Sequence, residues 1–378
     1  MTRPTVARVS LDAVRGNVRA IRAMLDREAA AAGRSAPGII AVVKANAYGH
    51  GAASVARACE DAGATTLACA DIEEGVALRD AGVTRPILVF GAQSVSDLAG
   101  VFTHRLTPTV STPGAAKALQ TEAAARGVTV TCHLKIDTGM NRLGFRHDNL
   151  RRTLPDVLGS ANLQFESVYT HFATADQPES AAFEEQRVRF DRSFAALGAM
   201  FLRSVSRHAA NSAAMLRDSR TWYDAVRPGL LIYGVAPPPL SAADLELRPA
   251  LSLHSRIVAV KGVRAGEGTG YGLRSQDDKP RTIAIVPAGY ADGLDTRASG
   301  RASVLVRGRR MPIVGSVCMD MITVDVTGTD VSPGDEVVLI GRQDQEEITA
   351  REIAASIGSI PWEVMCRLGS RVERQYDN

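Results

Sequence analysis

The segment AVVKANAYGHG, residues 41–51, places a lysine where it can act as a nucleophile. Lys44 directly follows an apolar run that predicts a buried strand. Partial desolvation lowers the pKa of an amine and makes it more reactive toward an aldehyde. A lone lysine at a strand end is more often a surface residue. The neighbouring glycines and Tyr48, however, let a ligand approach and offer it a hydroxyl, so this segment predicts a carbonyl-binding lysine.

Four more polar residues follow other apolar runs. Arg142, in KIDTGMNRLGF, comes after a glycine turn and can clamp a carboxylate through two hydrogen bonds. Ser212, in HAANSAA, begins a predicted helix, where a hydroxyl and a backbone N–H can bind phosphate. His171 in THFATAD and Arg227 in VRPGLLIYG end two further runs. Taken singly, a histidine at a strand end is more often a buried core residue, and Arg227 is equally compatible with a salt bridge under the barrel rim.

The C-terminal third contributes three motifs, GTGYG, PAGYADG and VGSVCMD. They contain Tyr271, Tyr290 and Met319, the last followed by Asp320. Tyrosines flanked by glycine are ordinary turn residues when taken one at a time. A further motif, PWEVMCRLGSRV, places Trp362 near the C-terminus.

The elements that must position these residues alternate regularly. Eight short apolar runs lie at 38–44, 66–70, 86–90, 106–110, 130–137, 165–171, 204–209 and 226–233. Helical patterns lie between them, at 51–62, 72–81, 112–126 and 178–199, and Thr112 before a proline predicts an N-cap. This α/β rhythm predicts a TIM-type (β/α)₈ barrel, whose chemistry lies at the carboxyl ends of the strands. An open doubly wound sheet is the runner-up, but no GxGxxG follows the first strand.

A proline-rich break divides the chain into two predicted domains. We assign residues 8–240 to the barrel and 241–378 to a mainly β C-terminal domain, on which residues 1–7 are expected to pack. Beyond the break the apolar runs are short, β-branched and punctuated by glycine and proline, as in strands. They lie at 251–260, 282–287, 303–307, 321–326 and 336–340.

Composition restricts the class of protein. The 378 residues are 45% hydrophobic with a net charge of only +3, so we expect no nucleic-acid or membrane partner. The five cysteines form no CxxC pair, which argues against a disulfide framework or a metal site and favours a reducing compartment. The N-terminus lacks an apolar signal core, and no apolar stretch is long enough to span a bilayer. We therefore expect a cytoplasmic protein.

The segment 41–51 resembles the cofactor-lysine signature of the alanine racemase family, and the similarity extends from residues 9–22 to about Arg374. The resemblance implies that Lys44 holds pyridoxal 5'-phosphate (PLP) as a Schiff base and that Tyr48 binds its phosphate. His171 would pack on the pyridine ring.

The resemblance also assigns the rest of the cofactor site. Ser212 and the backbone N–H groups of Gly229 and Leu230 would bind the phosphate. The family commonly has a second phosphate-binding tyrosine near the C-terminus, and this chain has Trp362 in its place. An indole donates one hydrogen bond but lacks the acceptor of a phenol.

Arg227, which the resemblance places at the pyridine nitrogen, bears on the reaction type. PLP stabilises a carbanion as an electron sink, and an acidic partner at the nitrogen would deepen that sink. An arginine is always charged and disfavours a second positive charge beside it. Reprotonation at the α-carbon is then favoured over transamination.

On the substrate side, the resemblance implies that Arg142 orients the substrate carboxylate and that Lys135 is a lysine often carbamylated in the family. Met319 would donate a backbone N–H to that carboxylate, and Tyr290 would line the pocket. Racemisation needs a base on each face of a planar intermediate. Lys44 and Tyr271 would be these bases, with Tyr271 supplied by the other subunit of a homodimer.

The resemblance thus implies the activity of the alanine racemase family, interconversion of L-alanine and D-alanine, which supplies D-alanine for peptidoglycan. A racemase for another or a broader small amino acid, such as serine, is the near alternative. A non-catalytic PLP-carrying barrel would lack the β domain. A PLP decarboxylase usually has an acid at the pyridine nitrogen, where this chain has Arg227.

Overall fold

The computed structural model describes residues 3–91, 97–200, 205–274 and 277–377, and the chain divides into two compact units. The barrel unit comprises Val14–Ala47 and Ala52–Leu247. The β unit comprises Met1–Ala13, Tyr48–Gly51 and Arg248–Asn378.

Within the described residues of the barrel unit, eight parallel strands close into a ring. They are β2 (Gly38–Val42), β3 (Thr66–Cys69), β4 (Ile87–Val89), β5 (Thr107–Val110), β6 (Val130–Asp137), β8 (Leu163–Tyr169), β9 (Ser206–Asn211) and β10 (Ala225–Arg227). Their order is β5-β4-β3-β2-β10-β9-β8-β6, and pairing of β5 with β6 closes the barrel. The short β7 (Phe145–Arg146) adds to β6 outside the ring. The predicted (β/α)₈ barrel is confirmed.

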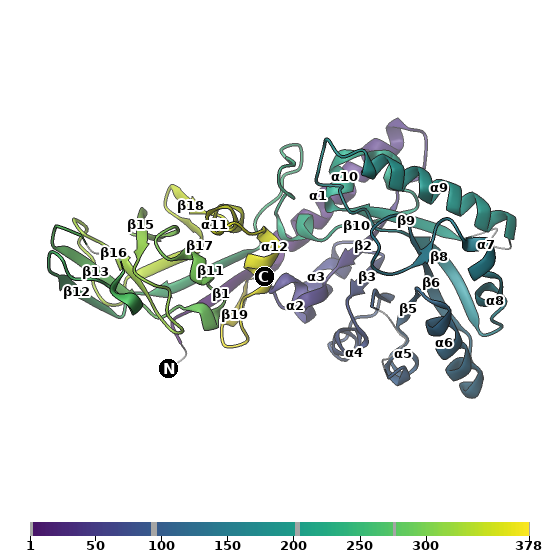
Figure 1. The fold of residues 1–378 in the computed structure, drawn as a ribbon, viewed down its shortest axis with the longest axis horizontal. Helices are drawn as coiled ribbons and strands as arrows, with labels where there is room; N and C mark the ends of the chain where they lie inside the picture. The colour runs from purple at the N-terminus through teal and green to yellow at the C-terminus, as the bar shows by residue number, and fades with distance from the viewer. Residues whose placement is uncertain (1–2, 92–96, 201–204, 275–276, 378) are drawn as a thin grey trace. The chain divides into compact units, whose positions relative to one another are not determined.

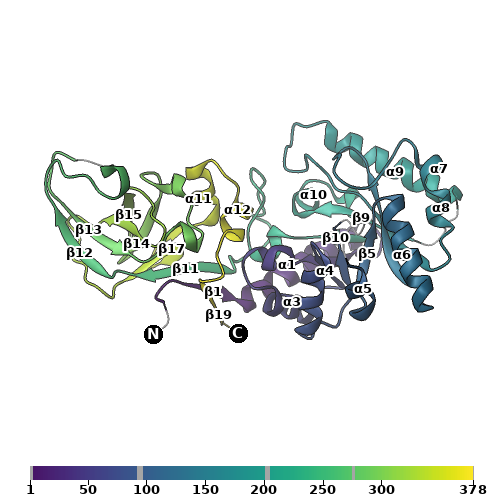
Figure 2. The same cartoon turned by 60° about the horizontal axis from the view of Figure 1, so that its bottom comes forward.

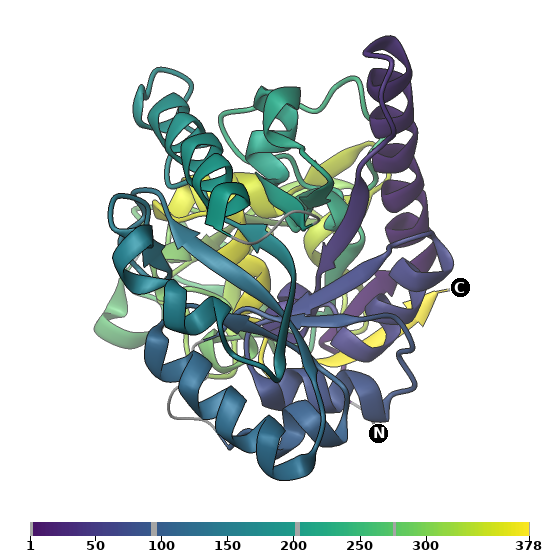
Figure 3. The same ribbon diagram turned by 90° about the vertical axis from the view of Figure 1, so that its right-hand side faces the viewer.

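Helices connect the strands and cover the barrel, as Figures 1 and 3 show for α4, α5 and α6. The helices of this part of the chain are α1 (Leu11–Ala31), α2 (Lys44–Tyr48), α3 (Ala52–Asp61), α4 (Ile72–Asp80), α5 (Ala99–Thr103), α6 (Pro113–Arg126), α7 (Leu150–Thr153), α8 (Pro155–Leu158), α9 (Ala182–Met200) and α10 (Ser212–Arg217), with 3₁₀ turns η1 (Ser219–Thr221) and η2 (Leu230–Tyr233). Thr112 caps α6 as predicted, because its hydroxyl accepts the N–H of Ala115 at 3.1 Å.

The predicted strand 226–233 is only partly a strand. Strand β10 ends at Arg227, and the apolar residues that follow form the buried turn η2. Pro228 has no N–H to donate to a neighbouring strand, so the ladder ends there. The N–H of Ile232 donates instead to the carbonyl of Gly229 at 2.9 Å. Of the predicted run 204–209, residue 204 lies outside the described residues.

The β unit is built on one large, mostly antiparallel sheet, which confirms the predicted mainly β fold of the C-terminal part. Its strands are β1 (Val6–Ser10), β11 (Leu251–Arg256), β12 (Ala259–Val263), β13 (Arg281–Val286), β14 (Ser303–Val306), β15 (Arg309–Val314), β16 (Ile322–Asp325), β17 (Glu336–Gln343), β18 (Glu346–Ile348) and β19 (Glu373–Asp377). The order is β12-β13-β16-β15-β14-β17-β11-β1-β19, with β18 beside β17. The N-terminal β1 runs antiparallel to β11 and parallel to β19 (Figure 2).

Short helical elements connect the strands of the β unit. They are η3 (Tyr271–Leu273), η4 (Tyr290–Asp292), η5 (Thr296–Ala298), α11 (Ala350–Ile357) and α12 (Pro361–Cys366). Across the described parts of both units, no helix is long and apolar enough to cross a membrane. None of the five cysteines, all of which lie in described segments, forms a disulfide.

Candidate functional site

The lysine singled out from the sequence begins an unusual turn. Lys44 is half-buried and comes one residue after Val43, beyond the carboxyl end of β2. The following residues Ala45–Tyr48 all have φ near 52°, which is left-handed helical geometry. This conformation costs roughly 1–2 kcal/mol per residue for L-amino acids, and such strain typically persists at functional sites. The backbone that carries Lys44 is therefore held in place by its surroundings.

Two side chains of the barrel unit brace this turn. The Glu74 carboxylate on α4 accepts the N–H of Ala45 at 2.6 Å and that of Ala70 at 2.8 Å. The Asn46 side chain accepts the N–H of Ala52 at 2.8 Å, where α3 begins. Sequence reasoning missed Glu74. Its spacing from the N-cap Asp71 is that of a capping box, which by itself predicts only a helix start.

Tyr48, the predicted phosphate ligand, lies buried within the β unit. Burial raises the pKa of its phenol, and the nearby Cys366 thiol raises it further, so the hydroxyl stays protonated. Gly49 has φ of +83°, and a Cβ there would collide with the carbonyl oxygen of Met365 on α12. The Gly49 carbonyl accepts a hydrogen bond from Arg374 at 3.0 Å. Close packing against α12 thus explains the glycine that follows Tyr48.

Lys135 is buried inside the barrel on β6. Burial lowers the pKa of its amine to about 8, with further lowering by the charges of Arg142 and Arg227. Its Nζ lies 5.4 Å from the centroid of the Tyr169 ring. A lysine with this pKa is partly neutral near physiological pH, and the neutral amine is the reactive form.

A shaped loop after β6 carries Arg142, whose side chain is exposed. The Asp137 carboxylate accepts the N–H groups of Gly139 at 3.0 Å and Asn141 at 3.1 Å. Gly144 closes the loop with φ of +122°, and a Cβ there would lie 2.8 Å from the Asp137 nitrogen. The sequence thus fixes the path of the loop while leaving the guanidinium of Arg142 accessible.

Arg227 ends β10 inside the barrel and is only 3% exposed. Its Nη2 donates to the carbonyl oxygens of Thr170 at 2.7 Å and Ala209 at 2.8 Å. Its Nη1 donates to Nδ1 of His208 at 2.7 Å. Burial lowers the pKa of Arg227 to about 10, so the guanidinium remains charged near neutral pH.

His171, two residues beyond β8, is surrounded by positive charge. Its Nδ1 lies 3.3 Å from Nη2 of Arg227. Desolvation and the charge of Arg227 lower the pKa of the imidazole well below its ordinary value. Lys135, Arg142 and Lys44 act in the same direction. His171 is therefore neutral at physiological pH, and these four cations form one cluster around it.

The residues predicted to bind phosphate, which follow β9 and β10, lie next to one another. Ser212 begins α10, which Asn211 caps by accepting the N–H of Ala214 at 2.9 Å. The Ser212 hydroxyl accepts the N–H of Gly229 at 2.9 Å. Leu230 begins the adjoining turn η2 and is fully buried, so its backbone is the part suited to a polar ligand.

The other four predicted residues of the β unit, besides Tyr48, lie on its loops and on α12. Tyr271 is 77% exposed, Met319 52% and Tyr290 45%. The Tyr290 N–H donates to the Cys318 carbonyl at 2.9 Å, which joins the loops of Tyr290 and Met319. The Ser316 hydroxyl donates to the Tyr271 carbonyl at 2.8 Å, which joins the loop of Tyr271 to the segment that carries Met319. Trp362 is half-buried in the first turn of α12.

A buried carboxylate that sequence reasoning missed organises these loops. Asp292 is fully buried and accepts the N–H of Gly289 at 2.8 Å. It forms ion pairs with Arg3 at 2.8 Å and Arg371 at 2.7 Å. Arg371 also donates to the Met319 carbonyl at 3.2 Å. Asp292 thus connects the Tyr290 turn to the Met319 loop, and its only sequence signal is an acid inside PAGYADG.

Replacing Asp292 with asparagine is expected to destabilise the protein by about 3 kcal/mol, because two arginines lose their buried partner. Urea denaturation followed by circular dichroism measures this change. Glu122→Gln, which removes one exposed i,i+4 pair with Arg126, is the control and should change stability by less than about 0.5 kcal/mol. Equal midpoints for the two variants would contradict the organising role of Asp292.

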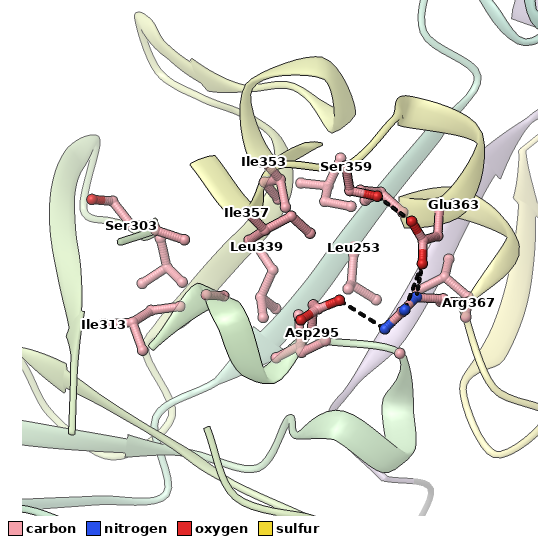
Figure 4. Close-up of a pocket in the computed structure, with 18 residues that line it drawn as sticks. Leu253, Asp295, Ser303, Ile313, Leu339, Ile353, Ile357, Ser359, Glu363 and Arg367 are labelled. Atoms are coloured by element: carbon pink, nitrogen blue, oxygen red, sulfur yellow. Dashed lines mark hydrogen bonds and ion pairs between the residues drawn. The ribbon is translucent and has the colours of Figure 1, made fainter. Parts of the chain in front are cut away.

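The β unit also contains a small, mainly apolar pocket, and none of the four predicted site residues Tyr271, Tyr290, Met319 and Trp362 lines it. Its volume is about 30 Å³, and Leu339, Ile353 and Ile357 form much of its wall (Figure 4). Asp295, Arg367 and Glu363 form ion pairs at one side. A space of this size holds about one water molecule, so we interpret it as a packing gap.

The residues of the cation cluster show whether the barrel has groups suited to bind PLP. Lys44, Lys135, Arg142 and Arg227 gather where β2, β6 and β10 end, and Ser212 and Gly229 lie where barrels of this class bind phosphate. Such a donor set suits a ligand that carries a phosphate and meets a carboxylate. Fold and charge together are those of a barrel suited to a phosphorylated ligand and a carboxylate-bearing substrate.

Comparison with known proteins identifies the family. Residues 9–237 match the model of the alanine racemase N-terminal domain, and residues 250–376 that of the C-terminal domain. Alanine racemases of Symbiobacterium thermophilum and Carboxydothermus hydrogenoformans are 42% and 41% identical, each over 99% of this chain and over 97% and 100% of their own length. The chain belongs to the alanine racemase family. It is a PLP-dependent isomerase that interconverts L-alanine and D-alanine.

Solved structures agree with this assignment. Alanine racemase from D-cycloserine-producing Streptomyces lavendulae superposes with a TM-score of 0.94 at 36% identity, covering 100% of this chain and 98% of that one. Alanine racemase from Bacillus anthracis, solved with bound L-Ala-P, gives a TM-score of 0.90 at 36% identity and covers 100% and 96%.

Proposed function

We propose that the chain racemises alanine by a two-base mechanism, in which Lys44 and Tyr271 exchange the α-proton on opposite faces of the substrate. The observation that carries this proposal is the cation cluster around His171 at the strand ends of the barrel, together with family membership. A panel of L-amino acids, each followed by chiral chromatography, tests it. We expect D-alanine to form fastest; a larger kcat/KM for L-serine would favour a racemase of broader specificity.

In this proposal the cofactor residues are those that family membership assigns. Lys44 would hold PLP covalently, and Tyr48, Ser212, Gly229 and Leu230 would bind its phosphate, with Trp362 near it. Neutral His171 would pack against the ring, because an uncharged imidazole does not repel the surrounding cations. PLP supplies an electron sink that makes the α-proton acidic.

The proposed substrate contacts follow from charge. Arg142 is exposed on a fixed loop and can clamp a carboxylate, while the Met319 N–H and Tyr290 would complete the pocket. Lys135 lies close enough to Arg142 for the two charges to repel. Its low pKa supports carbamylation, since a neutral amine reacts with carbon dioxide and the product is anionic. The carbamate would attract Arg142 and hold it in place.

Arg227 would face the pyridine nitrogen and keep a positive charge there. Replacing it with glutamate is expected to lower racemisation by about 100-fold and to raise the share of transamination, because an acid favours ring protonation. Coupled assays for D-alanine and pyruvate measure both products. Arg217→Glu is the control for adding a carboxylate, because Arg217 ends helix α10 and its guanidinium donates to carbonyls of residues 174–180. An Arg227→Glu enzyme as fast and as specific as the parent would contradict this role.

We further propose a homodimer in which Tyr271 of the partner subunit completes each site. Tyr271, Leu273, Tyr290, Met319 and Met321 are all large, exposed and gathered on the joined loops of the β unit. Exposed apolar groups of this extent typically mark a protein interface.

Mixing inactive Lys44→Ala with inactive Tyr271→Phe chains is expected to restore up to about a quarter of parental activity. Random exchange gives half mixed dimers, and each mixed dimer has one intact site of two. Subunit exchange is verified independently by mass spectrometry of differently tagged chains. Proven exchange without recovered activity would show that each site lies within one chain.

The biological role belongs to the proposal as well. D-alanine is a building block of peptidoglycan, and we propose that the chain supplies it in the cytoplasm. The number and spacing of its cysteines, an odd set without a CxxC pair, fit a reducing compartment.

A further inference from the structure

A chain of hydrogen bonds runs from Arg227 through the interior of the barrel. Nη1 of Arg227 lies 2.7 Å from Nδ1 of His208 on β9. Nε2 of His208 lies 2.9 Å from Nδ1 of His133 on β6. Nε2 of His133 lies 3.0 Å from the carboxylate of Glu166 on β8. Four strands of one barrel, β10, β9, β6 and β8, thus contribute to a single line of polar contacts.

The direction of the chain follows from its two ends. A guanidinium has donors only, so Nδ1 of His208 must accept and its proton must be on Nε2. That proton donates to His133, whose remaining proton on Nε2 then donates to Glu166. A carboxylate accepts, so every bond points from Arg227 toward Glu166. Both imidazoles are therefore assigned the Nε2–H tautomer by their partners.

The surroundings hold both imidazoles in place. His208 is buried, and desolvation with the charge of Arg227 lowers its pKa well below the ordinary value. The ring of Tyr169 stacks on His208 at a centroid distance of 4.7 Å, and its hydroxyl is 3.0 Å from Thr109. His133 is buried beside them. The hydrogen-bonded chain of side chains is thus packed within the barrel core.

Within the described part of the protein, the buried charge of Arg227 lacks a negatively charged neighbour in direct contact. Among the described residues, the hydrogen-bond partners of the buried Arg227 are carbonyls and imidazoles, and no carboxylate contacts it directly. A buried charge without compensation is costly. The phenol of Tyr169 acts on the charge of Arg227. The charges of Lys44, Arg142 and Arg227 act on the neighbouring Lys135, and Asp137 is the carboxylate that acts on Lys135 in the opposite direction.

Glu166 supplies the missing negative charge at the other end of the barrel. Its side chain is half-exposed and lines an open cavity of about 1090 Å³ at the amino ends of β5 and β6. Arg79 and Arg126 line the same cavity, but Arg126 pairs with Glu122. Because Glu166 reaches water, its carboxylate avoids the cost of full burial.

We propose that Glu166 acts, through His133 and His208, as the counter-charge of Arg227, which makes Glu166 and His133 positioning residues for the reaction. An ionised Glu166 polarises both imidazoles and strengthens acceptance at Nδ1 of His208, because hydrogen bonds in a chain reinforce one another. Arg227 is thereby held charged, with Nη1 directed at His208. The inference rests on the proposed function only where Arg227 is taken to face the cofactor.

Nuclear magnetic resonance of isotope-labelled histidine nitrogens in the holoenzyme tests the chain directly. We expect His208 and His133 to be neutral Nε2–H tautomers with low-field, slowly exchanging protons. In Glu166→Gln the amide oxygen still accepts but the charge is gone, so the His133 proton should move upfield and that of His208 should follow by less. Arg126→Gln, which changes the charge of the same cavity outside the chain, should move neither.

Kinetics give a second readout. Glu166→Gln is expected to lower kcat by roughly tenfold, the order of one hydrogen bond to a charged group, with KM nearly unchanged and a changed ratio of pyruvate to D-alanine. An Nδ1–H tautomer at His208 in the parent enzyme, or unmoved proton resonances in Glu166→Gln, would overturn the proposal. Racemisation by the parent enzyme is measured separately. A result that rejects the hydrogen-bonded chain from Arg227 to Glu166 can therefore be distinguished from one that rejects the proposed function.

Discussion

Replacing Lys44 with alanine is expected to reduce racemisation in both directions by roughly 10⁴-fold or more, because one change removes both the cofactor-binding amine and one base. The half-buried position of Lys44, one residue beyond Val43 and at the start of the left-handed turn, gives its amine a fixed origin. Initial rates with L-alanine and with D-alanine measure the loss. Lys117→Ala is the matched control, since Lys117 is an exposed lysine on α6, and it should leave both rates unchanged.

Borohydride reduction followed by peptide mapping locates the attachment site independently of activity. We expect the reduced adduct on the peptide that contains Lys44. Lys135 is the informative competitor, because its pKa of about 8 makes it the other reactive amine of the barrel interior. An adduct on Lys135 would require a different assignment of the cofactor lysine.

Replacing Tyr271 with phenylalanine should affect the two enantiomers unequally. The change removes the hydroxyl and keeps the ring, so the proposed base for L-alanine is lost while Lys44 can still act on D-alanine. We expect α-proton exchange from L-alanine to fall by about 10³-fold and exchange from D-alanine to fall far less. A phenol has an unperturbed pKa of about 10, so Tyr271 needs a charged neighbour to act as a base near neutral pH.

Deuterium wash-in at the α-carbon, followed by mass spectrometry, measures exchange for each enantiomer. Lys44→Ala rescued with a small amine should show the reverse bias. Tyr376→Phe is the control, because Tyr376 is also an exposed tyrosine of the β unit. Equal losses for both enantiomers in Tyr271→Phe would point to one base or to a structural tyrosine.

The barrel was predictable because its strands are covered on both faces. Runs such as 38–44 and 130–137 are continuously apolar or alternate toward a buried interior. The second is a strand over its full length, and the first is a strand over Gly38–Val42. The shortened β10 was not predicted, since an apolar run does not distinguish a strand from a buried 3₁₀ turn. Pro228 was the available signal.

Much of the site was predictable because its residues follow strand ends, where barrel chemistry lies. Arg142, His171 and Arg227 came from three separate segments, with Lys135 in the same segment as Arg142, and the charges of the three cations act on His171 in the structure. Their partners were less predictable. Glu74 lies in a pattern typical of a helix start, and its role in bracing the turn depends on tertiary contacts.

The interior histidines had a weaker signal. His133 and Lys135 are two residues apart on one strand, so period-two alternation points both into the barrel. That pattern was visible in VTCHLKID, but the distance from His133 to His208 depends on how β6, β8 and β9 stagger. Asp292 likewise acquires its role from Arg3 and Arg371, which lie at opposite ends of the sequence.

The most direct test of alanine racemisation is to incubate the purified chain with PLP and alanine of either hand in D₂O. Chiral chromatography with mass spectrometry then reports configuration and α-deuterium together. We predict that L-alanine and D-alanine each reach an equal mixture of the two enantiomers, both carrying deuterium at the α-carbon, with little pyruvate. Retention of the starting configuration, or conversion chiefly to pyruvate or ethylamine, would contradict the account.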